Sequence, residues 1–209
     1  MNILMHYIRK GGIKTMKKII GIFVCMLLIS IIFSTNATAG DETNPEIVDE
    51  IGDNPLSLLD IDKAWFFEKE DEPDYLFIKM KILLLKENYI AVFSIRWSYN
   101  DLEYAAGINT FSYRDTIFRC GLPKRATYWQ WNRMPKCDGI IDSEKGLITW
   151  KIPKSSIGNP KPGDVLSNTK ANAVPGFPLS FLYFMLNFDY RDFAPDNYGE
   201  YGFNYVVQY

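Results

Sequence analysis

The stretch Asp74–Trp97, DYLFIKMKILLLKENYIAVFSIRW, decides the fold class of this 209-residue chain. Apolar residues take every second position over Leu76–Leu84, with two lysines between them. After the polar break Lys86-Glu87-Asn88 the alternation resumes, and apolar residues share one face over Tyr89–Trp97. Such a period-two pattern on both sides of a short polar break is typical of an antiparallel hairpin with one buried face. We therefore expect a hairpin here, at the centre of a β-sandwich.

The rest of the chain supports the same fold class. Short apolar runs alternate with turns rich in Gly, Pro and Asp, and no long amphipathic helical pattern or internal repeat is present. This predicts an all-β protein with two antiparallel sheets, of the jelly-roll or immunoglobulin-like kind. Residues 153–158 are expected to form one short helical turn, because Pro suits its start and Gly its end. The polar run Val165–Val174 is expected to be an edge strand.

The first 39 residues have the features of an export signal rather than of a folded domain. Met16-Lys17-Lys18 supplies positive charge, Ile19–Phe33 is an apolar run, and Ala37-Thr38-Ala39 is a small-x-small cleavage site. We expect translation to start at Met16 and cleavage to follow Ala39; the alternative is an uncleaved membrane anchor. Residues 40–48 are then an acidic tether, and 49–209 form one domain. The predicted location is extracellular or at the cell surface.

Charge and histidine content exclude several functions. The chain from Gly40 onward holds all 25 acidic residues but only 18 of the 23 basic ones, a net charge of −7. Nucleic acid and anionic membranes are therefore poor partners, and membrane contact is expected only through an uncleaved leader. The single histidine, His6, lies in the leader. Its loss would exclude Ser-His-Asp catalysis and His-ligated haem. No haem or nucleotide cofactor is expected.

Two cysteines remain after the leader, Cys120 and Cys137. An isolated pair in an exported protein indicates a disulfide. The alternative is a pair of buried free thiols. A bond between them would stabilise the fold by about 3 kcal/mol in the chain-entropy description.

Four segments resemble a known class of extracellular module. They are the D-x-x-x-D loop at 49–53, LDIDKA at 59–64, GLITWKIPKSSIGNPKPGD at 146–164 and DFAPDNYGEY at 192–201. Together they resemble the β-sandwiches related to DOMON domains and family-nine carbohydrate-binding modules, which occur in surface proteins of archaea and bacteria. The resemblance implies a sandwich that binds sugars, sometimes with structural calcium. The haem-binding members differ from this chain, which has no histidine after its leader.

Acidic residues form the first candidate site. Most of them precede the first long strand and the others lie before the last strand, so their loops could converge at one end of a sandwich. Calcium prefers six to eight hard oxygen ligands, and it is the expected ion. The alternative is that these aspartates only cap turns. The candidate metal ligands are Asp49, Asp53, Asp60, Asp192 and Asp196, with Asp62 close by in the sequence.

Aromatic and polar residues form the second candidate site, for a carbohydrate. Flat aromatic rings beside amide and charged donors are typical of sugar-binding surfaces. The alternative is that the tryptophans belong to the core, since aromatic residues dominate core burial. The candidate ligand-binding residues are Tyr128, Trp129, Trp131, Asn132 and Arg133.

Catalysis is not expected. The carboxylate pairs Asp101/Glu103 and Asp142/Glu144 are better explained as surface turns than as the acid and base of a glycosidase. The sequence therefore predicts a secreted or cell-surface, non-catalytic module that binds carbohydrate or another envelope component. The first alternative is a structural or adhesive envelope protein that pairs with protein partners through the Val165–Val174 edge. A small hydrolase ranks last.

Overall fold

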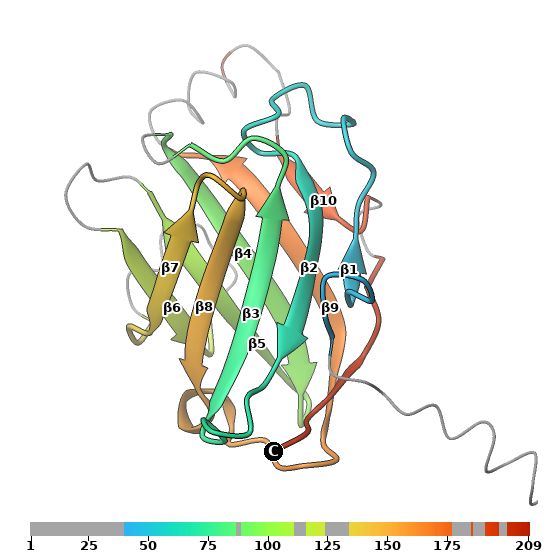
Figure 1. Ribbon diagram of the computed structural model, residues 1–209, viewed down its shortest axis with the longest axis vertical. Coiled ribbons are helices and arrows are strands. Elements are labelled where there is room, and N and C mark those ends of the chain that lie inside the picture. Colours follow the sequence, from blue (N-terminus) through green and yellow to red (C-terminus); the bar gives the residue numbers. More distant parts are fainter. Residues whose placement is uncertain are drawn as a thin grey trace, which may run out of the picture. The chain divides into compact units, whose positions relative to one another are not determined.

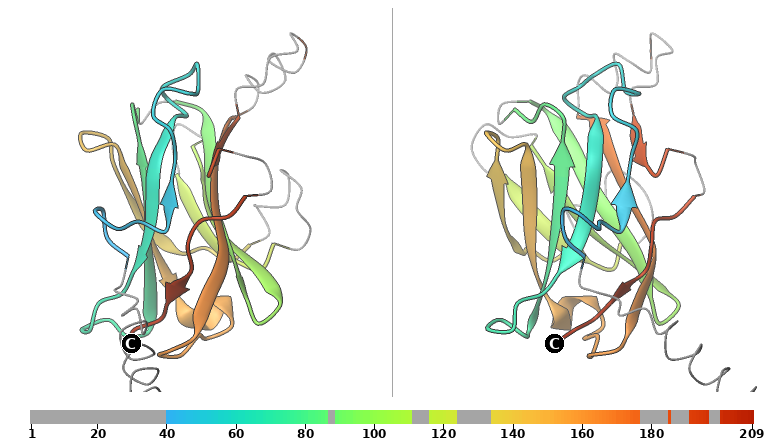
Figure 2. Two further views of the ribbon diagram at one scale, coloured as in Figure 1. Left: turned by 90° about the vertical axis from the view of Figure 1, so that its right-hand side faces the viewer. Right: turned by 45° about the vertical axis from the view of Figure 1, so that its right-hand side comes forward.

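The structure of the protein is a computed structural model that describes residues 40–86, 89–110, 116–123, 134–176, 185, 191–196 and 200–209. The chain divides into two units, Met1–Ala37 and Thr38–Tyr209, and only the second is considered below. In this unit two antiparallel sheets pack face to face, which confirms the predicted β-sandwich (Figures 1 and 2). No helix among the described residues is long and apolar enough to cross a membrane; the apolar run 19–33 lies outside them.

Each sheet combines strands from separate parts of the sequence. The first has the order β1 (Ile47–Val48), β2 (Ile61–Phe67), β3 (Tyr75–Ile82), β8 (Leu147–Pro153), β7 (Asp138–Asp142). The second has the order β10 (Asp192–Ala194), β9 (Val165–Pro175), β4 (Ala91–Tyr99), β5 (Leu102–Asn109), β6 (Ile117–Gly121), and β11 (Tyr205–Val206) also pairs with β9.

The predicted hairpin at 74–97 is wrong, although its buried faces are right. Strand β3 pairs with β2 and β8 in the first sheet, whereas β4 pairs with β5 and β9 in the second. The two strands are therefore joined by a connection that crosses between the sheets. Each strand buries the face that was predicted. The alternation of apolar and polar residues shows which face of a strand is buried, but it does not show which strand lies beside it. Leu84, expected on the buried face, is 47% exposed because β3 ends at Ile82.

The tight hairpin of this region is the next one along the chain, β4–β5. Tyr99 pairs with Leu102, and the two residues between them, Asn100 and Asp101, have φ angles of 49° and 59°. Positive φ at both central residues is the geometry of a type I′ turn, whose twist matches that of the paired strands. Asn and Asp tolerate this conformation better than other non-glycine residues.

Strand β9 is not the open edge that its polar sequence suggested. Its outer side is paired with β10 at 171–173 and with β11 at 165–166. Between these contacts the Gly202 N–H donates to the Thr169 carbonyl at 2.8 Å. Segments remote in sequence thus pair with the outer side of this strand at these positions, which disfavours the addition of a partner strand there.

The short helical turn is confirmed. It is the 3₁₀ helix η2 (Lys154–Ile157), which follows Pro153 and ends at Gly158 with φ of 85°. Glycine is needed there for two reasons. Its positive φ is unfavourable for other residues, and a Cβ at this position would lie 2.6 Å from the Tyr104 hydroxyl. The turn caps the end of the sandwich where β2 and β8 finish (Figure 1).

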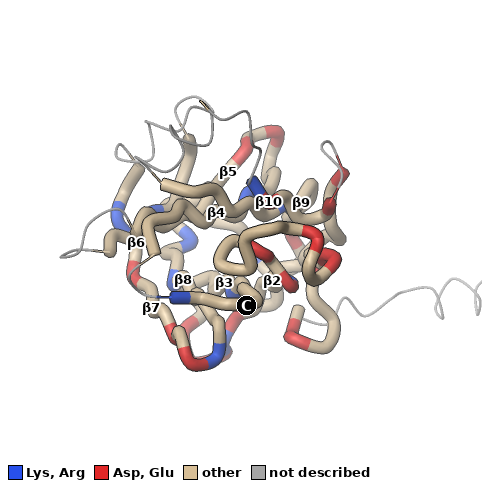
Figure 3. Tube along the Cα trace, turned by 90° about the horizontal axis from the view of Figure 1, so that it is seen from above, with Lys and Arg blue, Asp and Glu red and all other residues tan. Residues whose placement is uncertain are grey.

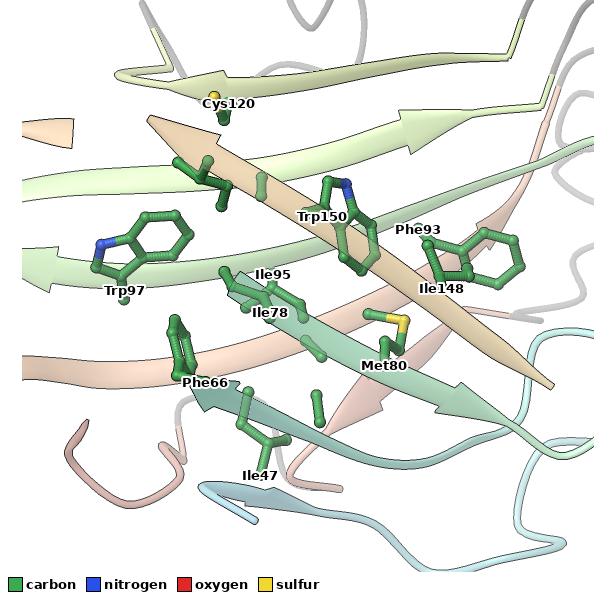
Figure 4. Packing of buried hydrophobic residues seen from close by; sticks show 14 of the residues in the cluster. Ile47, Phe66, Ile78, Met80, Phe93, Ile95, Trp97, Cys120, Ile148 and Trp150 are labelled. Carbon is green, nitrogen blue, oxygen red and sulfur yellow. The ribbon is translucent and has the colours of Figure 1, made fainter. Parts of the chain in front are cut away.

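Large aromatic and aliphatic side chains fill the space between the sheets (Figure 4). Phe66 of the first sheet meets Trp97 of the second edge to face, with ring centroids 5.7 Å apart. Trp97 and Trp150 are both fully buried. Fully burying such side chains stabilises the fold by about 3 kcal/mol each, so this layer fixes how the sheets stack and where their end loops meet.

Candidate metal centre

Three aspartates from both sheets meet at the end of the sandwich where β2 begins. Carboxylate oxygens of Asp53, Asp60 and Asp192 all lie within 4.8 Å of one another. The first two belong to the β1–β2 connection of the first sheet, and Asp192 opens β10 of the second. Figure 3 shows acidic residues gathered beside β2 and β10. The stacking of the sheets therefore builds this cluster.

Backbone hydrogen bonds hold two of these carboxylates in place. The Ile61 N–H donates to Asp192 Oδ2 at 2.6 Å, which ties β10 to the start of β2. The Gly52 N–H donates to Asp60 Oδ2 at 2.9 Å, and Gly52 has a φ of 90° that closes the loop between them. Each of these two contacts uses one oxygen, Oδ2, of its carboxylate.

Two further aspartates extend the cluster, so all five predicted ligands come together. Burial is the main cause that raises the pKa of Asp49 to about 9, and the carboxyl groups of Asp196 and Asp192 contribute to this rise. Burial and the neighbouring Asp196 also raise the pKa of Asp53. Burial, with Asp53 as a like-charged neighbour, raises the pKa of Asp192 to about 6. Each carboxyl group is thus harder to ionise than an isolated one.

Several oxygens of the cluster are buried and unpartnered. Apart from the contact between the Asp49 and Asp196 carboxyl groups, both oxygens of Asp49 and Oδ1 of Asp60 have no hydrogen-bond partner, although Asp49 and Asp60 are only 8% and 0% exposed. The salt bridges in the described part of the chain include none of the five aspartates. Asp62, by contrast, lies 3.8 Å from both Lys63 and Lys81 and stays outside the cluster. Buried acceptors without donors or cations are costly, and a bound cation would satisfy them.

The donor set fits a hard divalent cation. Every candidate ligand is a carboxylate oxygen, which suits calcium or magnesium rather than zinc or copper. Two oxygens on one calcium ion, each 2.3–2.6 Å away, lie at most about 5 Å apart, and the three aspartates above satisfy this limit. Calcium also tolerates irregular sets of six to eight ligands better than magnesium does, so it is the better match.

One neighbour of the cluster was missed by the sequence reasoning. The Asn54 side chain is 6% exposed, and its hydrogen bond to Asp192 opposes the rise in the pKa of that carboxyl. Asn54 Oδ1 accepts from the Leu56 N–H at 2.8 Å, which fixes the turn. Its position directly after Asp53 was the only available signal, since Asn in a loop is common for local reasons.

The other predicted sites fare differently. Tyr128, Trp129, Trp131, Asn132 and Arg133 lie outside the described residues. Of the two carboxylate pairs, expected in surface turns, Asp101 and Glu144 lie in turns, whereas Glu103 belongs to β5 and Asp142 to β7. Asp101 is in the β4–β5 turn, Glu103 pairs with Arg96 at 3.0 Å, and Asp142 pairs with Lys145 at 2.9 Å.

The two cysteines lie side by side but as free thiols. Cys120 is buried in β6, and Cys137 belongs to a segment that pairs with it. The Cys120 N–H donates to the Pro135 carbonyl and the Cys137 N–H to the Phe118 carbonyl, both at 3.1 Å. The adjacent Cys120 thiol and burial raise the pKa of Cys137. The predicted disulfide is not formed in this structure.

Comparisons with known proteins add no assignment, since no protein-family model, curated protein or solved structure matches the chain. The class of protein rests on the fold and the cluster: an all-β sandwich with a group of aspartates between the ends of its two sheets.

Proposed function

We propose that the protein is an exported, non-catalytic β-sandwich module that binds a surface carbohydrate or another envelope component, and that calcium completes its acidic end. The observation that carries the calcium part is the set of buried, unpartnered oxygens of Asp49 and Asp60. The export and carbohydrate parts are supported by the leader-like segment at 16–39 and by the DOMON-like segments.

Calcium would act as a structural cross-link. Asp49, Asp53 and Asp60 belong to the first sheet's end loop, whereas Asp192 and Asp196 belong to β10 and the residues after it. An ion shared among them neutralises their mutual repulsion and ties the two sheets together at this end. Calcium is abundant outside cells, so a modest affinity suffices for an exported protein.

A thermal melt in EDTA and in millimolar calcium tests the calcium part. At 100 times the dissociation constant the ion stabilises the folded form by about 2.7 kcal/mol, which raises the melting temperature by roughly 5–10 °C. Asp53→Asn is expected to reduce this shift strongly, because Asp53 is one of the three closest carboxylates. Asp62→Asn is the matched control and should leave the shift intact. An unchanged wild-type melt would show that these aspartates only cap turns.

The binding part is tested separately with the calcium-loaded protein. Retention on a glycan array or on isolated envelope material is expected, with a chelator and a heat-denatured sample as controls. No retention on either would remove the binding proposal and leave the calcium site standing.

The disulfide is proposed for the exported form. Cys120 and Cys137 are adjacent in space, and an oxidising compartment favours their pairing. Intact mass measured with and without reductant should differ by two hydrogens. Two thiols that alkylate in unreduced, unfolded protein would refute the bond.

A further inference from the structure

A buried carboxylate lies at the start of β1, apart from the acidic cluster. Glu46 is 5% exposed, and its Oε2 accepts a hydrogen bond from the Phe66 N–H at 2.8 Å. Among the described residues it forms no salt bridge with Lys or Arg. The titratable groups that interact with it are Asp41, of the same sign, and the Tyr205 phenol, which is neutral because burial and nearby carboxylates raise its pKa. A buried anion in such surroundings needs a counter-charge.

The carboxylate of Glu46 lies directly against Gly40. A Cβ built on Gly40 would lie 2.2 Å from both Glu46 oxygens, so any larger residue would have to displace the carboxylate. Gly40 is itself buried. Its backbone nitrogen is only about 1.5 Å from its Cα, and this nitrogen is part of the peptide bond at which cleavage of the leader is expected.

We propose that cleavage after Ala39 creates the counter-ion of Glu46: the new α-ammonium group of Gly40 pairs with the buried carboxylate and fastens the mature N-terminus to β1 and β2. This inference rests on the proposed export of the protein. A signal peptidase hydrolyses the Ala39–Gly40 amide with one water molecule. The C–N bond breaks, hydroxide adds to the Ala39 carbonyl to give a carboxylate, and the amine leaves protonated.

Cleavage then changes the charge state of a buried site. Without a cation, burial raises the pKa of Glu46 to about 7, so near neutral pH the carboxyl group is only partly ionised. An α-amino group has a pKa near 8 and is charged under the same conditions. An ammonium in contact with the carboxylate favours the ionised form of both groups. Processing therefore stabilises the fold around neutral pH instead of only shortening the chain.

The test compares two exported proteins. The first is the natural chain, and the second carries Ser-Ser inserted between Ala39 and Gly40, so that cleavage leaves the amine two residues away from Glu46. Mass spectrometry confirms each N-terminus. At pH 7.5 the natural protein is expected to melt higher by several degrees, since about 1 kcal/mol corresponds to 2–4 °C for a chain of this size. At pH 5 the difference should shrink, because Glu46 is then protonated in the extended protein.

Glu46→Gln in both proteins is the matched control and should abolish the difference, because no anion remains for the amine. Equal melting temperatures for the natural and extended proteins at pH 7.5, with both N-termini confirmed, would overturn the inference and leave export intact. If the exported protein begins at another residue, the predicted cleavage site is wrong. The pair is then measured on chains released by a tag-specific protease immediately before Gly40 or before the Ser-Ser extension.

Discussion

The two ends of strand β2 handle buried negative charge in opposite ways. Asp60 precedes the strand and Glu68 follows it, about 26 Å away for eight residue steps of extended chain. Glu68 Oε1 forms an ion pair with Lys154, which is 4% exposed. Its Oε2 accepts hydrogen bonds from the Tyr205 hydroxyl at 2.9 Å and from the Gln208 N–H. Asp60 and its neighbours have no cation of this kind among the described residues.

The difference shows which charges the chain balances by itself. At the Glu68 end, Lys154 of η2 supplies a cation and Tyr205 and Gln208 supply donors to one carboxylate, so this site is complete. At the Asp60 end five carboxylates converge, and the donors to them that the described residues show are backbone and amide groups. A charged group removed from water requires a partner, and where the protein supplies none, a ligand can supply it.

Removing the cation at the complete end should have the largest effect. Lys154→Met leaves the carboxyl group of Glu68 buried without its counter-ion. We expect this to lower the free energy of unfolding by about 3–5 kcal/mol. Urea denaturation measures the loss. Adding Glu68→Gln to this variant should recover part of it, because the uncompensated charge is gone. A cost below about 1 kcal/mol for Lys154→Met would mean that the pair is exposed to water in solution.

The next effect is a pH dependence from Glu46. In protein carrying the Ser-Ser extension, the pKa of Glu46 is about 7 in the folded state against 4.5 ordinarily. The folded state binds this proton more tightly than the unfolded state does. The stability that Glu46 contributes through this proton is therefore fully present below pH 4.5 and is lost as the pH rises through 7. The loss is roughly 3 kcal/mol. The difference in stability between the extended protein and its Glu46→Gln variant, followed from pH 4.5 to 8 in calcium, isolates this effect from the aspartates. A constant difference would contradict the assignment.

Asp49→Asn should stabilise the protein in EDTA and destabilise it in calcium. In EDTA it removes one of the repelling carboxylates and supplies an amide donor, so we expect stabilisation of about 1 kcal/mol. In calcium it removes a ligand and should forfeit much of the stabilisation of about 2.7 kcal/mol that the ion supplies. Thermal melts in both conditions show the reversal. The same sign in both would separate Asp49 from the metal.

The smallest effect should come from Tyr205→Phe at the complete end. It removes one neutral donor from Glu68 and leaves Lys154 in place. The expected cost is about 1–2 kcal/mol by urea denaturation. A cost as large as that of Lys154→Met would indicate that the hydroxyl, not the lysine, balances this carboxylate.

The buried faces of the strands could be predicted, whereas their partners could not. Leu76, Ile78 and Met80 alternate with lysines, and all three are buried. The same alternation arises whether the next strand turns back beside β3 or crosses to the opposite sheet. The choice depends on β8, more than 60 residues away, which occupies the place beside β3 that the hairpin would have given to β4.

The candidate metal centre was easier to predict than the complete site. Asp49, Asp53 and Asp60 lie close together in the sequence, so the excess of negative charge in this region is visible there. Glu68 and Lys154 are separated by 86 positions and resemble ordinary surface residues. Asn54 was missed for the related reason that its partner, Asp192, comes from β10.

The sequence by itself determined the all-β class, the helical turn after Pro153 and which aspartates form the acidic cluster, because each depends on local alternation, local turn chemistry or local composition. Tertiary structure alone decided that β3 and β4 lie in different sheets and that β9 is covered. It also paired Glu68 with Lys154 and placed Glu46 against Gly40. These outcomes depend on contacts between segments far apart in the chain. The free energy of burying a charged group or a backbone group depends on the partners it meets, and these partners come together only when the two sheets pack.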